Sequence, residues 1–113
     1  MDEAFAVDQW DDHDLVRIAV RGELDVATAP SLREHLFAAV DRSNGPVIVD
    51  LLGVTFIDST ALGVLIGTKE RCDALGIELR LVLEESRIIK VFEITGLTEL
   101  FSISSTVDQA VAR

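Results

Sequence analysis

The stretch Val47–Gly63 constrains the fold more than any other part of the chain, because it passes from a strand pattern to a helix pattern. It opens with Val47–Leu51, a mostly β-branched apolar run that is typical of a strand buried on both faces. A short connection then leads to Asp58–Thr60, where apolar residues begin to recur at helical spacing. We therefore expect a buried strand, followed by a helix from about Thr60 to Leu75 with Gly76 as its stop signal.

Patterns of the same two kinds alternate along the rest of the chain. The further expected strands are Phe5–Trp10, Leu15–Gly22, Ile77–Leu83 and Leu100–Ile103, and the further expected helices follow Thr28, Glu84–Ser86 and Ser105 or Thr106. The order β-β-α-β-α-β-α-β-α is typical of an α/β domain with a mixed, mostly parallel sheet of about four to five strands and about four helices. At 113 residues, the chain has the size of a single domain.

Several local signals set the expected boundaries of these elements. Gly22–Asp25 is interpreted as a turn that ends a strand and brings two carboxylates to one end of the sheet. Thr28 can cap the first long helix, and Gly45 can end that helix in the left-handed conformation. The last helix is expected to bury Val107, Ala110 and Val111.

Composition excludes several classes of function. A formal net charge of −10 disfavours nucleic acid and anionic membrane surfaces as partners, and it favours a basic protein partner or simple solubility. No apolar run approaches the roughly 18 residues of a membrane-spanning helix. The single cysteine, Cys72, suits core filling in a cytoplasmic protein. His13 and His35 lack further ligands at metal-binding spacing, so we expect no metal and no cofactor.

The junction Asp58–Thr60 has two compatible interpretations. Aspartate, serine and threonine are common helix caps, and an exposed hydroxyl at this place can also be phosphorylated. A serine-hydrolase nucleophile is disfavoured, because the small residues that flank such a serine would fall at Ile57 and Ala61. A phospho-acceptor role for Asp50, with a metal held by Glu23 and Asp25, is a weaker alternative.

Ser59, Gly63 and Gly67 lie four residues apart, and thus on one face of the expected helix. A glycine inside a helix costs about 0.8–1 kcal/mol relative to alanine. We therefore expect that another part of the protein, or a partner, approaches the helix backbone closely along this face. Packing of the helix against the sheet and docking of a partner beside Ser59 explain this strip equally well.

Three segments, in order, resemble the bacterial anti-sigma factor antagonists, which belong to the sulfate transporter and anti-sigma factor antagonist (STAS) domains. These segments are Gly22–Asp25, Val47–Gly63 and Val91–Leu97. The resemblance implies a single STAS-like domain over residues 1–113. The chain departs from the pattern at Ala61, where the family most often has glycine, and we expect only a slightly firmer helix start from this change.

The resemblance also implies a mechanism, in which Ser59 is the residue phosphorylated and Thr60 is a secondary candidate. The unphosphorylated protein would bind an anti-sigma factor, a serine kinase of the histidine-kinase-like ATPase fold, and release the sigma factor. Phosphorylation would dissolve that complex, and a metal-dependent serine phosphatase would restore the antagonist. Asp25 matches a family position that contacts the kinase, and the expected contact surface also includes Asp58, Thr60, Gly63 and Gly67.

On this interpretation the protein is a cytoplasmic phosphorylation substrate and binding module with no catalytic residue of its own, present as a monomer or weak dimer. The alternative is a scaffold that does not switch, such as a stressosome-like component or an accessory subunit of a lipid transporter. Such proteins share the fold and can keep the same hydroxyls.

Overall fold

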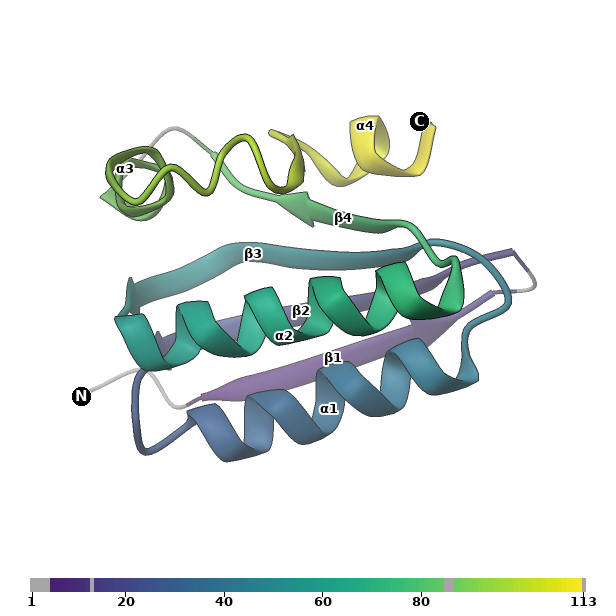
Figure 1. The fold of residues 1–113 in the computed structure, drawn as a ribbon, viewed down its shortest axis with the longest axis horizontal. Helices are drawn as coiled ribbons and strands as arrows, with labels where there is room; N and C mark the ends of the chain where they lie inside the picture. Colours follow the sequence, from purple (N-terminus) through teal and green to yellow (C-terminus); the bar gives the residue numbers. More distant parts are fainter. Residues whose placement is uncertain (1–4, 13, 85–86, 113) are drawn as a thin grey trace.

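The computed structural model describes residues 5–12, 14–84 and 87–112, which form one five-stranded sheet and four helices (Figure 1). The strands are β1 (Ala6–Asp11), β2 (Val16–Leu24), β3 (Val47–Ile57), β4 (Leu79–Val82) and β5 (Ser102–Ser104). The helices are α1 (Ala29–Arg42), α2 (Ser59–Leu75), α3 (Arg87–Ile94) and α4 (Val107–Ala112). This order confirms the predicted alternation of elements. His13 and Glu85–Ser86 lie outside the described residues.

The strands lie in the sheet in the same order as in the chain, β1-β2-β3-β4-β5. β1 is antiparallel to β2, and the other three pairs are parallel. The predicted mixed, mostly parallel sheet is therefore confirmed. Each parallel connection passes through at least one helix, as parallel neighbours require.

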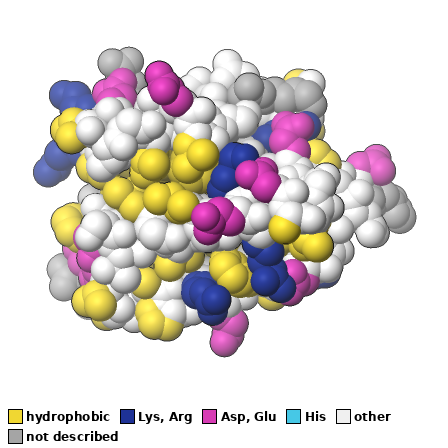
Figure 2. Space-filling view, viewed as in Figure 1, with side chains coloured by type: hydrophobic (Ala, Val, Ile, Leu, Met, Phe, Trp, Pro, Cys, Tyr) yellow, Lys and Arg dark blue, Asp and Glu magenta, His cyan; other side chains and the backbone are white. Residues whose placement is uncertain are grey.

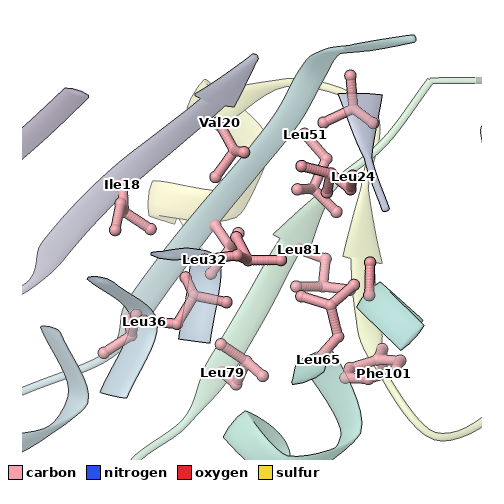
Figure 3. Close-up of a cluster of buried hydrophobic side chains, with 14 of the residues drawn as sticks. Ile18, Val20, Leu24, Leu32, Leu36, Leu51, Leu65, Leu79, Leu81 and Phe101 are labelled. Atoms are coloured by element: carbon pink, nitrogen blue, oxygen red, sulfur yellow. The ribbon is translucent and has the colours of Figure 1, made fainter. Parts of the chain in front are cut away.

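The main hydrophobic core lies between the sheet and helices α1, α2 and α3. β2 buries alternate residues against these helices, as its sequence pattern predicted. Figure 3 shows side chains of this core, contributed by β2, β3, β4, α1, α2 and the segment before β5: Ile18, Val20, Leu24, Leu32, Leu36, Leu51, Leu65, Leu79, Leu81 and Phe101.

A second, smaller cluster covers the opposite face of the sheet. It joins Ile48 of β3, Val82 of β4 and Ala110 of α4. Ile48 lies between Val47 and Val49, which belong to the main core, so α4 packs on the face away from α1 and α2. The prediction that β3 is buried on both faces is confirmed over its first half.

Two predicted boundaries around the central strands are wrong. β2 does not end at Gly22 but continues to Leu24, with a shift in pairing register between Gly22 and Glu23. β3 has no short connection after Leu51 and runs to Ile57, because the extended β2 supplies pairing partners along its length. Both boundaries are set by the pairing of β2 with β3. The sequence of either strand taken alone does not reveal this pairing.

Thr28 and Gly45 flank α1 as expected, but each acts differently from the prediction. The Thr28 side chain does not cap the helix; its hydroxyl accepts from the Asp25 amide (3.0 Å) and donates to the Glu23 carbonyl (2.9 Å). Gly45 does not adopt the left-handed conformation. A Cβ at that position would lie 1.9 Å from the carbonyl oxygen of Asp14, so glycine is needed there for close approach.

The last helix, α4, is tied to the sheet by Arg80 of β4. Arg80 is 6% exposed, and its guanidinium donates to the Ala110 carbonyl (2.8 Å) and to the Glu78 carboxylate (2.6 Å). β4 itself is shorter than the predicted strand Ile77–Leu83, and all four of its residues are buried.

The predicted cap of the last helix is confirmed at Thr106, whose hydroxyl accepts from the Gln109 amide (3.1 Å). Ala110 is buried as expected, but Val111 is 46% exposed, so its predicted burial is wrong. α4 is only six residues long and turns a single narrow face toward the sheet.

Candidate functional site

β3 and α2 meet at Asp58, which is the N-cap of α2. Its carboxylate Oδ1 accepts a hydrogen bond from the Ala61 amide (3.1 Å), and its own amide donates to the Leu24 carbonyl (3.0 Å). The first bond confirms the predicted cap, and the second ties the junction to the end of β2. The helix begins at Ser59, one residue earlier than expected.

Ser59 and Thr60 are the first two residues of α2, and both are exposed. Within the described part of the chain, neither hydroxyl makes a hydrogen bond. They lie at the positive end of the helix macrodipole, where an added phosphate group is tolerated well. The junction therefore presents two free hydroxyls at a position that can accept a negative charge.

The turn between β2 and α1 lies at the same edge of the sheet. Leu24 pairs with Ile57, so Asp25 and Asp58 both follow the last paired residues of neighbouring strands. The Asp25 carboxylate accepts from the amides of Ala27 (3.0 Å) and Thr28 (3.1 Å), which fixes the shape of the turn. The half-buried Asp25 thus belongs to the rim around the start of α2.

The glycine strip of α2 does not serve packing against the sheet. A Cβ on Gly63 would meet no atom within 4 Å, and the residue is exposed. A Cβ on Gly67 would lie 3.7 Å from Cζ of Phe37 on α1, which is an ordinary contact. α2 packs inward through other residues, including Leu62 and Leu65. Of the two explanations for Gly63, sheet packing is therefore wrong.

A groove of about 410 Å³ opens between the starts of α1 and α2. It is lined by Val26, Ala29, Pro30, Arg33, Thr60 and Val64. Figure 2 views this helical side of the molecule, where basic side chains lie among hydrophobic ones over α1. Sequence reasoning missed this groove; its one signal was Val26, an apolar residue placed in a turn, which is 70% exposed.

Asp50 is unsuited to the alternative role of phospho-acceptor. It lies within β3, and not at the end of the strand, because β3 continues to Ile57. Its carboxylate is 3.6 Å from the Arg17 guanidinium and accepts from the Leu52 amide at 2.9 Å. Asp50 is 8% exposed, so both its position and its bonding argue for a structural ion pair. The phospho-acceptor interpretation of Asp50 is wrong.

The described residues contain no group of three or more histidine, cysteine or acidic side chains that could hold a metal. His35 lies on α1, with its ring Nδ1 2.8 Å from the Ser31 carbonyl oxygen of the same helix. Cys72 is buried in the main core, as predicted, and burial raises the pKa of its thiol to about 11. None of the helices described here has the length and apolarity needed to cross a membrane.

The family model of the STAS domain matches residues 6–110 of this chain. This chain belongs to the STAS domain family. The resemblance drawn from its three sequence segments is thereby confirmed, and the STAS fold accounts for the mixed sheet and its helices.

Relatives of this STAS domain include proteins with an assigned role. An anti-sigma-B factor antagonist of Bacillus subtilis (strain 168) is 36% identical over 90 residues, which cover 80% of this chain and 82% of the relative. One of Staphylococcus aureus (strain NCTC 8325 / PS 47) is 37% identical over 87 residues, covering 77% and 81%. The crystal structure of an anti-sigma factor antagonist from Mycobacterium paratuberculosis superimposes with a TM-score of 0.81 at 27% identity, covering 96% and 92%.

Proposed function

We propose that this STAS domain is an anti-sigma factor antagonist that is switched by phosphorylation of Ser59. The observation that carries the proposal is the exposed Ser59 hydroxyl, which no described residue engages, at the start of a helix whose adjoining face is open at Gly63. Its similarity to anti-sigma-B factor antagonists over four-fifths of its length supports the same role.

In the unphosphorylated state, the surface around the start of α2 binds the anti-sigma factor, and the sigma factor is released. Asp25, Asp58, Thr60, Gly63 and Gly67 contribute to this surface. Because Gly63 carries no side chain and has no neighbour within 4 Å of a Cβ position, a partner can approach the backbone of α2 directly. The protein acts by occupying its partner and performs no chemistry itself.

Phosphorylation reverses this binding. The Ser59 Oγ attacks the γ-phosphorus of ATP held by the kinase, an Oγ–P bond forms, the bond to the β-phosphate oxygen breaks, and the hydroxyl proton passes to a base of the kinase. The product carries about 1.5 to 2 added negative charges. The start of α2 tolerates this charge. A partner surface packed against Ser59 does not, because the phosphate group is bulky and its burial at the interface would cost desolvation free energy.

The finer parts of this scheme follow from the family. The anti-sigma factor is a serine kinase of the histidine-kinase-like ATPase fold, and a metal-dependent serine phosphatase removes the phosphate from Ser59. The antagonist works in the cytoplasm as a monomer or weak dimer. Thr60 is the secondary acceptor, because it shares the exposure of Ser59.

Labelling with ATP and an anti-sigma factor kinase from the same genome tests the assignment. We expect one phosphate by intact-mass measurement on the wild type, on Thr60→Ala and on the remote control Ser105→Ala. Ser59→Ala should lose this labelling, apart from any slow transfer to the secondary acceptor Thr60. Undiminished labelling of Ser59→Ala would refute Ser59 as the acceptor. Ser59→Asp should weaken binding to the kinase, although one carboxylate imitates a phosphate incompletely.

A pull-down separates this function from the scaffold alternative. Recovery of an anti-sigma factor kinase that leaves the complex after addition of ATP supports the switch. Recovery of transporter subunits or of large homo-oligomers, without a kinase, supports the non-switching scaffold.

A further inference from the structure

The side chain of Arg33 stands out on the surface near Ser59, because it is a fixed cation without a counter-ion. It is exposed on α1, and its guanidinium carbon lies 4.4 Å from the centre of the Phe37 ring. Among the described residues, no carboxylate pairs with it. Arg87 and Lys90 of α3 also lack an ion pair among the described residues, but of these three cations it is Arg33 that lines the groove next to Thr60.

The surroundings of Arg33 hold it in place without neutralising it. Phe37 also carries the Arg71 guanidinium, 5.0 Å from the ring centre. Arg71, in contrast, is bound by both carboxylate oxygens of Asp41, at 2.7 and 2.8 Å. The ring thus positions two arginines, of which one is paired within the protein and the other is left for a partner. Cation–π stacking of this kind orders a guanidinium while leaving its donors free.

Arg33 also lines the groove described above, whose other walls are mostly apolar. Val26 and Pro30 come from the α1 side, and α2 contributes Thr60, the residue after Ser59, and Val64. The groove therefore combines an apolar cavity with a single cation at its wall. A partner that fills it best offers an apolar side chain with a carboxylate close by, since each part would meet its complement.

We infer that this groove binds a segment of the anti-sigma factor that carries an apolar side chain beside a carboxylate, and that Arg33 pairs with that carboxylate. This inference rests on the proposed function, because it takes the anti-sigma factor as the partner at Ser59. Arg33 is a specificity residue in this arrangement. Its charge selects an acidic partner segment on a protein whose overall charge of −10 would otherwise repel one.

The test compares Arg33→Gln with Lys90→Gln, which removes an exposed cation from α3 and gives the same change in formal net charge, from −10 to −11. Binding of the purified anti-sigma factor is measured by calorimetry with ADP, so that no phosphoryl transfer occurs. We expect Kd to rise about tenfold for Arg33→Gln and to stay within about twofold for Lys90→Gln. Raising the salt concentration should bring the Kd values of the wild type and Arg33→Gln closer together, because salt screens the charge pair.

A matched apolar pair examines the cavity itself. Val26→Ser removes an apolar side chain that is 70% exposed in the groove, and Ile94→Ser removes one that is 85% exposed on α3. We expect several-fold weaker binding for the first variant only. Thermal unfolding of all variants should match the wild type, because these side chains are exposed.

Charge reversal identifies the partner group. Arg33→Glu should abolish most of the binding, and replacement of one carboxylate of the anti-sigma factor by lysine should restore it to that variant. Equal binding by Arg33→Gln and Lys90→Gln, while Ser59→Asp still weakens the complex, would overturn the Arg33 contact and leave the proposed function standing. Failure of the wild type to bind an anti-sigma factor would overturn the proposed function itself.

Discussion

The carboxylate of Asp58 accepts a hydrogen bond from the amide of Ala61, and this bond fixes the start of α2 next to Ser59. The proposed phosphorylation site is therefore presented by a capped helix and not by a loose loop. The cap also leaves the Ser59 and Thr60 hydroxyls available, because a neighbouring side chain serves the helix amide in their place.

Replacing Asp58 by alanine should lower the free energy of unfolding by about 1 kcal/mol, since the Ala61 amide loses its partner. Asp58→Asn should keep most of the stability, because asparagine is an equally good cap. Urea unfolding of the three proteins measures the difference. Equal losses for alanine and asparagine would mean that the charge, and not the hydrogen bond, stabilises the junction.

Gly63→Ala should separate stability from binding. A Cβ at this position meets no neighbour, so alanine should raise the free energy of unfolding by about 0.8–1 kcal/mol through helix propensity alone. The same change should weaken the anti-sigma factor complex, because it adds a side chain to the open face beside Ser59.

Gly67→Ala is the control for that experiment, because its Cβ would meet only Phe37 at 3.7 Å. It should also stabilise the fold, with a smaller effect on binding because it lies one helical turn farther from Ser59. Gly63→Ala protein that is more stable and binds with unchanged affinity would argue against docking at this face.

Gly45 and Gly76 should respond differently to alanine. At Gly45 a Cβ would lie 1.9 Å from the Asp14 carbonyl oxygen, so the backbone must move, and we expect a loss of about 3 kcal/mol. Gly76 has φ of +70° with open space around it, so alanine there should cost about 1–2 kcal/mol of conformational strain. Chemical denaturation of both variants should reproduce this order.

The Cys72 thiol should make stability fall at high pH. Burial, reinforced by the charge of Asp73, raises its pKa from the ordinary value of 9.0 to about 11. The folded protein thus holds this proton more tightly than the unfolded chain. The corresponding stability, about 2–3 kcal/mol at most, is complete below about pH 9 and is lost as the pH rises toward 11.

The comparison with Cys72→Ala isolates this titration. The variant should be less stable at neutral pH, because it leaves a cavity in the core, but its free energy of unfolding should fall less steeply between about pH 9 and 11. Parallel curves for the two proteins would show that other groups cause the alkaline loss.

The order of elements could be predicted because strands and helices impose different periods on the sequence. The bounds of α2 were predicted to within one residue, since a cap marked its start, a terminal glycine marked its end and a helical period ran between them. The role of Thr28 could not be predicted in the same way. Its hydroxyl can serve a helix amide or a turn, and the positions of Glu23 and Asp25 decide between them.

The burial of Arg80 and the groove at Arg33 could not be read from local patterns either. Arg80 becomes buried because the Ala110 carbonyl, thirty residues later, is brought to it by α4. The groove forms where the starts of two helices meet, and its lining residues are separated by long stretches of chain. Sequence periodicity describes one helix or strand at a time, so it cannot predict features that form between two elements.

The order of strands in the sheet, which is the order of the chain, has a consequence for how the protein is made. As the polypeptide leaves the ribosome, each new strand finds the preceding one already at the growing edge of the sheet. None of the five must be inserted between two that are already paired. β3, which carries the junction to Ser59, can therefore dock on the β1–β2 hairpin before the last third of the chain has been synthesised.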